Sequence, residues 1–222
     1  MTTAIIVAAG KSERMGAGVD KAFLPLCSKP VLAWSLLAFE RSPDINRIVL
    51  VVRKEQIVAA EALAKMFGIS KLAKIVPGGK TRSDSVMAGL AQCDIDTKIV
   101  VVHDGARPLV SKNVIAQVVA AARKGPVAVG QRVVDALKRV EKGTTIQESV
   151  SREKIWAVQT PQAFPIGILN SSYKALDSKE SYADDCQVVE KAGHQVKIVE
   201  STEPNFKITV ASDLQLVSYF LK

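Results

Sequence analysis

The sequence predicts a doubly wound α/β fold, in which helices cover both faces of a mostly parallel sheet. Two observations support this prediction. Short apolar runs rich in β-branched residues alternate along the chain with longer stretches of helical periodicity. The short runs also lack the polar alternation of a half-exposed strand, which indicates strands buried on both faces, as in a parallel sheet.

The predicted elements follow one another in this alternating order. The predicted strands are residues 4–7, 47–52, 98–102 and 127–129. The predicted helices are residues 30–41, 56–67, 83–92 and 113–123. Towards the end of the chain we expect a helix near 165–173, a helix at 184–192, a strand at 195–199 and a final helix from residue 213. Ligands of such sheets bind beyond the carboxyl ends of the strands, so the loops after residues 7, 76, 102 and 129 are expected to converge.

Residues 131–156 interrupt the alternation. They read as two strands around a turn at Lys142 and Gly143, with so many polar positions that an isolated hairpin would bury little. We therefore expect a protruding β-hairpin arm that packs on another surface. A second copy of the chain would provide that surface, because two-fold dimers are the commonest closed assembly. The alternative is an arm folded back over its own domain.

Length and composition limit the class of protein. With 222 residues, of which 48% are hydrophobic, the chain suits one well-packed domain, and we expect a single domain over residues 1–222. No apolar run in the sequence approaches the roughly 18 residues of a membrane helix. The short apolar run at residues 4–9 has no basic flank ahead of it, which a signal peptide would need. These features predict a cytoplasmic protein that does not bind a membrane.

The cysteines and histidines do not form a pattern of metal ligands. The three cysteines are scattered without a Cys-x-x-Cys pair, which argues against both a disulfide framework and a zinc site. The two histidines have no cysteine or second histidine at ligand spacing, and we read both as structural. The residues concerned are Cys27, Cys93, Cys186, His103 and His194.

The charge of the chain favours an anionic partner. Lys and Arg outnumber Asp and Glu by 30 to 22, which gives a formal net charge of +8. A nucleic-acid partner is disfavoured, because the basic residues occur at most in pairs and only 5% of the residues are aromatic. A small phosphorylated substrate fits better, although a solvated basic surface would give the same charge.

The loop after the first predicted strand lies in the stretch AIIVAAGKSERMG, residues 4–16. Small residues and cations in such a turn are typical of phosphate binding. The spacing matches neither of two familiar phosphate loops. A Walker A loop needs glycine at Ile5, and a dinucleotide fingerprint needs it at Ser12 or Lys21. A phosphate would therefore be bound in a third way, by the cations Lys11, Arg14 and Lys21.

Two further loops add groups suited to phosphates. The second contains Gly79 and several cations ahead of a helix start at residues 83–85, where free backbone N–H groups can bind an anion or a base carbonyl. The third places Asp104 just after a buried strand, with Arg107 three residues on. A lone carboxylate facing cationic loops can anchor Mg²⁺ when phosphates supply the other ligands. A turn residue or a helix cap would look the same in the sequence.

No residue pattern supplies an obvious general base. A phosphate monoester needs none, because its second pKa is about 6 and it is largely dianionic at neutral pH. A phosphate that attacks a nucleoside triphosphate needs relief of charge repulsion, in-line geometry and cations on the equatorial oxygens as pyrophosphate leaves. Lysine and arginine side chains with one magnesium ion would suffice.

Six motifs, in order along the chain, carry a more specific resemblance. They are Ala8-Ala9-Gly10-x-x-x-Arg14-Met15-Gly16, Lys21 with Phe23-Leu24, Gly78-Gly79 through Arg82-x-Asp84-Ser85-Val86-x-Ala88-Gly89-Leu90, His103-Asp104-x-Ala106-Arg107-Pro108, Thr160-Pro161-Gln162, and Lys207-Ile208-Thr209. Each motif alone is weak. Together they resemble, nearly from end to end, the 2-C-methyl-D-erythritol 4-phosphate cytidylyltransferase family of the non-mevalonate isoprenoid pathway. The resemblance implies a Rossmann-like nucleotidyltransferase fold.

The resemblance also implies roles for individual residues. The basic residues of the first loop that stabilise the α-phosphate match Arg14 and Lys21, and a phosphate-facing lysine matches Lys207, so these three are the predicted catalytic residues. Nucleotide binding is expected from Ala8, Ala9, Gly10, Lys11, Gly79 and Ser85, with Lys11 included only as a neighbour in the loop. Asp104 is expected to lie near magnesium, and Arg107 in the substrate site.

The family also implies an assembly and a set of ligands. Its arm, here at about residues 132–156, crosses to the neighbouring subunit, where Arg152 is expected to bind the methylerythritol phosphate. We therefore expect a homodimer with exchanged arms that uses Mg²⁺ and acts on CTP and a polyol phosphate.

The chain departs from the family pattern at three positions. Ala136 stands where the arm usually has a threonine whose hydroxyl bonds the substrate phosphate. Asp20 replaces a proline before Lys21, and its carboxylate could partly offset the charge of that lysine. Ser12 replaces a glycine and is small enough to be tolerated. Because of Ala136, a cytidylyltransferase for ribitol phosphate or another polyol phosphate stays open. A catalytically silent nucleotide-binding module of the same fold also stays open, because fold does not guarantee chemistry.

Overall fold

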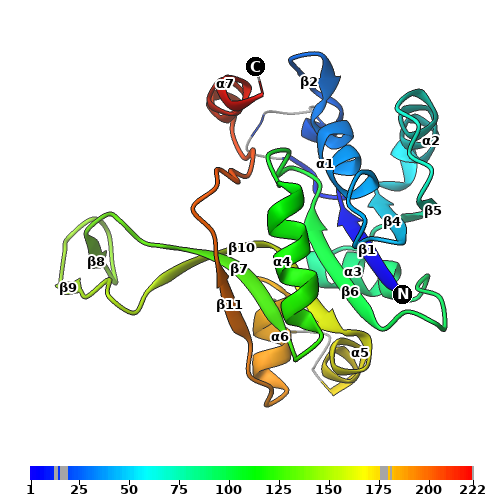
Figure 1. Cartoon of the computed structure of the whole chain (residues 1–222). Coiled ribbons are helices and arrows are strands. Elements are labelled where there is room, and N and C mark those ends of the chain that lie inside the picture. Colours follow the sequence, from blue (N-terminus) through cyan, green and yellow to red (C-terminus); the bar gives the residue numbers. More distant parts are fainter. Residues whose placement is uncertain (13–14, 16–19, 176–179, 181, 222) are drawn as a thin grey trace.

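The computed structural model describes residues 1–12, 15, 20–175, 180 and 182–221, and its main feature is a seven-stranded sheet between helices (Figure 1). The strand order is β11-β7-β10-β6-β1-β4-β5. The strands are β1 (Thr2–Val7), β4 (Arg47–Val52), β5 (Leu72–Pro77), β6 (Ile99–Asp104), β7 (Val127–Arg132), β10 (Trp156–Pro165) and β11 (Lys197–Glu200). All neighbouring pairs are parallel except those of β10, which runs antiparallel to β6 and β7.

Helices cover both faces of the sheet, which confirms the doubly wound arrangement. One face carries α1 (Val31–Glu40), α2 (Ile57–Met66) and α4 (Lys112–Ala122), and the other carries α3 (Arg82–Leu90), α5 (Ile166–Ala175) and α6 (Asp185–Lys191). Because successive strand residues point to opposite faces, Ile6 of β1 joins the first apolar cluster and Ile5 the second. None of the helices in the described part of the chain is long and apolar enough to cross a membrane.

The last helix, α7 (Ala211–Phe220), packs beside the start of α1. It joins a third apolar cluster through Val217, together with Leu26 and Val31. Leu26 belongs to β2 (Pro25–Leu26), which pairs with β3 (Lys29–Pro30) just before α1. The final helix therefore lies over the segment that follows the first loop.

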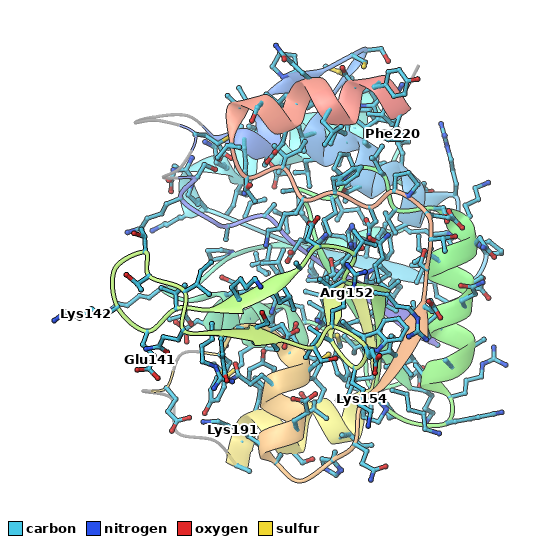
Figure 2. All side chains as sticks on the ribbon, turned by 90° about the vertical axis from the view of Figure 1, so that its left-hand side faces the viewer. Glu141, Lys142, Arg152, Lys154, Lys191 and Phe220 are labelled. Carbon is cyan, nitrogen blue, oxygen red and sulfur yellow. The ribbon has the colours of Figure 1, made fainter. Side chains whose placement is uncertain are left out.

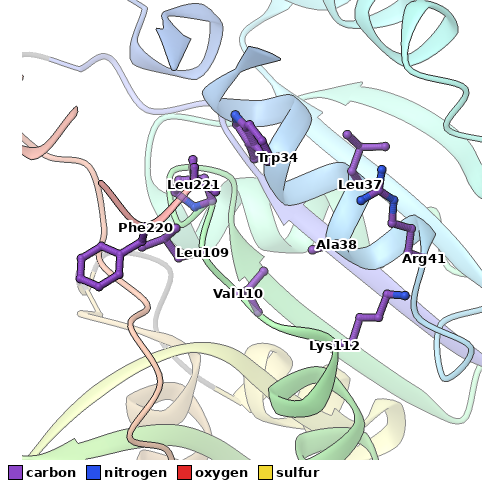
Figure 3. A pocket seen from close by; sticks show the side chains of 10 residues that line it. Trp34, Leu37, Ala38, Arg41, Leu109, Val110, Lys112, Phe220 and Leu221 are labelled. Atoms are coloured by element: carbon purple, nitrogen blue, oxygen red, sulfur yellow. The ribbon is translucent and has the colours of Figure 1, made fainter. Parts of the chain in front are cut away.

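A small hollow of about 260 Å³ lies between α1, the segment leading into α4 and the end of α7 (Figure 3). Its lining includes the apolar side chains of Trp34, Leu109 and Phe220, with Arg41 and Lys112 as its cations. The lining includes none of the site residues predicted from the sequence.

The predicted hairpin arm is present at one end of the sheet (Figure 1). It follows β7 and leads back into β10, and within it β8 (Leu137–Arg139) pairs antiparallel with β9 (Glu148–Val150). Glu141 and Lys142 lie in the turn between β8 and β9, and Arg152 follows β9 ahead of β10 (Figure 2). Val134 is 77% exposed and Ile146 is 58% exposed, so apolar side chains of the arm face solvent in the single chain.

Candidate active site

A cavity of about 1240 Å³ opens at the carboxyl ends of β1, β4, β5 and β6. Its walls are the loops that follow these strands, together with Lys207 and Thr209 ahead of α7. The predicted site residues that line it are Ala8, Ala9, Gly10, Lys11, Lys21, Gly79, Ser85, Asp104 and Lys207. The segment after residue 129 was also expected here, but it continues β7 towards the arm and is not part of the described lining.

Gly78 and Ser85 join the loop after β5 to the loop after β1. The buried Ser85 Oγ accepts a hydrogen bond from the Gly79 N–H at 3.2 Å and donates one to the Thr81 carbonyl at 3.0 Å. A β-carbon at Gly78 would lie 2.3 Å from Ala9 Cβ and 2.7 Å from Ser85 Oγ. Real β-carbons do not approach other atoms so closely, so the absence of a side chain at Gly78 brings the two predicted nucleotide-binding segments together.

Asp20 and Arg53 fasten the short turn that carries Lys21. Asp20 caps the turn η2 (Lys21–Phe23) by accepting a hydrogen bond from the Ala22 N–H at 3.1 Å. Arg53 Nη2 lies 2.7 Å from Asp20 Oδ2. The hydrogen bond to Asp20 raises the pKa of Arg53. Arg53 thus compensates the Asp20 charge, while Lys21 Nζ donates to the Ile208 carbonyl at 3.0 Å.

Asp104 lies at the centre of a group of cations from three separate segments. Its carboxylate is 2.7 Å from Lys207 Nζ, 3.4 Å from Arg82 Nε and 3.7 Å from Arg107 Nε. Burial alone would raise the pKa of Asp104, but Lys207, Arg82 and Arg107 together hold it well below its usual range. The carboxylate is therefore ionised throughout the neutral range, and it fixes the positions of the surrounding cations.

Arg82 of this group and its second partner, Asp185, are residues that the sequence did not identify as site residues. Arg82 begins α3 and lines the cavity, and its Nη1 lies 2.8 Å from Asp185 Oδ2. Asp185 is fully buried at the start of α6, where Tyr173 Oη donates to Asp185 Oδ1 at 2.5 Å. The sequence signal for Asp185 was the pair Asp184-Asp185. A helix start needs one acidic residue as its cap, and Asp184 takes that role, so the second acid is left for another function.

His103 precedes Asp104 but is fully buried behind it. Its Nδ1 lies 3.1 Å from Thr160 Oγ1 and its Nε2 lies 3.1 Å from the Arg107 carbonyl, while its ring packs against Phe39. Burial lowers the pKa of His103 to about 4, so the imidazole is neutral at neutral pH. It has a structural role in this position.

Two predicted site residues in the described part of the chain do not line the cavity. Arg107 lies beside it, because its Nη1 donates to the Asn205 carbonyl at 2.8 Å while its Nε faces Asp104. Arg152 lies on the arm, where its Nη1 donates to the Val134 carbonyl. Arg14 falls outside the described residues.

The donor set around the cavity suits a metal held partly by its substrate. Within the described ranges, no group of three or more His, Cys, Asp and Glu side chains is placed to hold a metal ion. Asp104 combines an ionised carboxylate with a position on the cavity wall near the centre of the cations. Magnesium is commonly bound by one or two carboxylates together with substrate phosphates, and Asp104 fits that pattern.

The cavity at the carboxyl edge of a doubly wound sheet, with cationic loops as its walls, places the protein among the α/β nucleotidyltransferases. The family model for 2-C-methyl-D-erythritol 4-phosphate cytidylyltransferase matches residues 2–222, and the chain belongs to this family. The resemblance inferred from the six motifs is therefore confirmed.

Individual relatives agree over nearly the whole chain. The chain is 41% identical over 215 residues to the 2-C-methyl-D-erythritol 4-phosphate cytidylyltransferase of Alkaliphilus metalliredigens, with 96% of this chain and 89% of the relative covered. It is 40% identical over 222 residues to the enzyme of that name from Desulforamulus reducens, with 99% and 95% covered. Among solved structures, 4-diphosphocytidyl-2C-methyl-D-erythritol synthase from Anaerococcus prevotii has a TM-score of 0.87 and 28% identity, covering 99% of this chain and 95% of that chain.

Proposed function

We propose that the protein transfers a cytidylyl group from CTP to 2-C-methyl-D-erythritol 4-phosphate, giving CDP-methylerythritol and pyrophosphate in isoprenoid precursor biosynthesis. The observation that carries the proposal is the match of the family model to residues 2–222. The arrangement of charge in the cavity supports it, because Lys21, Lys207 and Arg82 line a space at the strand ends where a triphosphate would bind.

In the proposed reaction, a phosphate oxygen of the acceptor attacks the α-phosphorus of CTP. A new P–O bond forms, the bond from the α-phosphorus to the bridging oxygen breaks, and pyrophosphate leaves with the electron pair. The acceptor phosphate is largely dianionic at neutral pH, so no side chain has to remove a proton. The main barrier is repulsion between two anions, and fixed cations lower it. We assign this role to Arg14, Lys21 and Lys207.

The ligands of the nucleotide follow from the loops of the cavity. We propose that Ala8, Ala9, Gly10, Lys11, Gly79 and Ser85 bind CTP, and that Asp104 and Arg107 contribute to the substrate site. We propose Mg²⁺ as the cofactor, with Asp104 as its protein ligand. When bound, the ion would neutralise charge on the phosphate oxygens.

We further propose a cytoplasmic homodimer with exchanged arms. In this arrangement residues 1–222 form one nucleotidyltransferase domain, and the arm at about residues 132–156 mediates dimerisation. Exposed apolar residues of the arm, such as Val134 and Ile146, support a partner surface, because a lone two-stranded hairpin is only marginally stable. Arg152 would then reach the acceptor phosphate in the neighbouring subunit.

One observation favours a second acceptor. Ala136 is exposed on the arm and has no hydroxyl with which to bind an acceptor phosphate. A cytidylyltransferase for ribitol phosphate or another polyol phosphate is therefore the alternative proposal.

Pyrophosphate release with CTP, Mg²⁺ and a panel of polyol phosphates tests these proposals. Release with 2-C-methyl-D-erythritol 4-phosphate alone is the expected result. Release with ribitol phosphate or another polyol phosphate instead would support the alternative acceptor. A protein that binds CTP but releases no pyrophosphate with any acceptor would contradict both, and would identify a catalytically silent nucleotide-binding module. An Ala136→Thr variant provides a matched test, since it should lower KM for the correct acceptor.

A further inference from the structure

We propose that Asp185 is a positioning residue that acts on Asp104 through Arg82, and so links helix α6 to the catalytic cavity. The kinetic consequences of this inference rest on the proposed function. Its structural consequence, the position of Arg82, can be tested independently of any activity.

The geometry supports this link because one guanidinium joins two carboxylates from separate elements. Arg82 Nε lies 3.4 Å from Asp104 Oδ1 at the end of β6, and Arg82 Nη1 lies 2.8 Å from Asp185 Oδ2 on α6. A guanidinium is planar and its five N–H donors have fixed directions. The position of one carboxylate therefore limits where the rigid guanidinium can place the nitrogen that forms an ion pair with the other.

Asp185 is itself held rigidly. Its side chain is fully buried, and Tyr173 Oη of α5 donates to Oδ1 at 2.5 Å, opposite the oxygen that faces Arg82. Its backbone N–H donates to Gln162 Oε1 of β10 at 3.2 Å. Contacts from α5 and β10 thus fix the end of the link that lies farther from the cavity.

The cost of burying Asp185 indicates that its carboxylate needs Arg82 as a partner. A buried carboxylate is strongly disfavoured unless it is paired, and Arg82 provides the pairing charge. The helix does not require the second acid, because Asp184 already caps α6 through its bond with the Gln187 N–H at 2.9 Å. Asp185 differs from Asp184 in its full burial, its hydrogen bond from Tyr173 and its ion pair with Arg82.

Loss of the Asp185 charge should release Arg82 at one end. Arg82 lines the cavity and 22% of its side chain is exposed, so a released guanidinium can turn towards bound phosphates. Asp104 would then lose a partner that helps to fix its orientation next to Lys207. Misplacement of reacting groups by about 1 Å can cost roughly a hundredfold in rate. We expect a loss of about 10- to 100-fold in kcat/KM.

The test compares two isosteric variants of adjacent residues. Asp185→Asn should lose about 10- to 100-fold in kcat/KM for pyrophosphate release, whereas Asp184→Asn should stay within about twofold of the wild type, since asparagine is also a good helix cap. In an Arg82→Gln background, Asp185→Asn should add less than about a twofold further loss, because its effect passes through Arg82. Equal losses in the two single variants, or additive losses in the double variant, would overturn the inference.

Two further measurements cover the cases in which Asp185→Asn does not fold or the wild type is inactive. Tyr173→Phe keeps all charges and removes the hydroxyl that orients Asp185. Its kcat/KM should fall while its melting temperature changes little, and that loss should vanish in the Arg82→Gln background. A crystal structure of Tyr173→Phe or Asp185→Asn should show Arg82 displaced from Asp104. An unmoved Arg82 would refute the link. Absence of pyrophosphate release from the wild type would instead refute the proposed function.

Discussion

The contact at Gly78 allows a sharp test of whether the loops after β1 and β5 form one nucleotide site. In Gly78→Ala, the new β-carbon would start 2.3 Å from Ala9 Cβ and 2.7 Å from Ser85 Oγ. Carbon atoms pack best at about 3.5–4.0 Å, so one segment must move by more than about 1 Å. A β-carbon cannot rotate away from its own backbone. The displacement must therefore involve the backbone of the Ala9 loop, the Gly78 loop or both.

The expected cost of Gly78→Ala follows from this geometry. Overpacking of this kind typically lowers the free energy of unfolding by about 1–3 kcal/mol. Urea unfolding measures this loss, which appears as a lower unfolding midpoint. A shift of about 1 Å in the nucleotide-binding backbone should also weaken CTP binding, or slow turnover, by roughly a hundredfold. Gly167→Ala is the control, because nothing lies within 4 Å of its β-carbon position on α5. Wild-type CTP affinity and turnover in folded Gly78→Ala would refute a shared site.

Three further predictions concern catalysis, assembly and pH. Lys21→Ala should lower kcat by about a hundred- to a thousandfold while the unfolding curve stays close to the wild type, because it removes one partner of the transition-state charge; an unchanged kcat excludes that role. Mixing Arg152→Ala with Arg14→Ala subunits should restore about a quarter of the wild-type activity, since random exchange gives that fraction of complete sites; exchange without recovery means that the arm does not cross. Burial lowers the pKa of His103 to about 4 in the folded chain, so as the pH falls the histidine is protonated first in the unfolded chain. The free energy of unfolding should therefore drop by about 3 kcal/mol between pH 6.5 and 4. His103→Gln should flatten the urea stability profile in that window, and an unchanged profile would assign the pH dependence to other groups.

Most of the sheet strands that the sequence predicted are buried on both faces, whereas β11, predicted at 195–199, is largely exposed. β4 has the predicted bounds, and β1 and β6 differ by one or two residues, because their apolar runs are continuous. β5 was not predicted as a strand because it lies at the sheet edge, where Lys74 and Pro77 are exposed and the apolar run is interrupted. Its hydrogen bonds come from β4, which a local pattern does not reveal.

β10 was missed for a different reason. Pro161 and Pro165 argue against a strand at the centre of a sheet, because proline cannot donate to the ladder. In the structure, Pro161 lies where the pairing with β7 shifts register between Val158 and Gln162, so the irregular stretch accommodates it. The final helix begins at Ala211 rather than at residue 213, because Asp213 is the residue whose side chain accepts from the Val210 N–H and caps the start.

The sequence predicted which loops would supply the cations, because parallel strands bring their carboxyl ends to one edge. It did not predict how those cations pair. The sequence indicated only that the Asp20 carboxylate could partly offset the charge of Lys21, and the structure adds that Asp20 pairs with Arg53 of another loop. Asp185 was expected only as part of a helix. Its partner Arg82 is far away in the sequence, on α3 ahead of β6. Such pairs depend on distances that only the packed sheet and helices determine.

The exposures of the cations around Asp104 suggest how the cavity accepts an anionic ligand. Arg82, Arg107 and Lys207 carry three positive charges against the two carboxylates of Asp104 and Asp185, so the group is close to neutral before any ligand binds. Lys207 is the most exposed of the three, at 34% against 22% for Arg82 and 12% for Arg107. It can turn from Asp104 to a phosphate at the lowest desolvation cost, while the two arginines keep the carboxylate in place. The buried Ile208 that follows donates its N–H to the Ala106 carbonyl and accepts from Lys21 Nζ, so the same short segment brings both proposed catalytic lysines to one wall of the cavity.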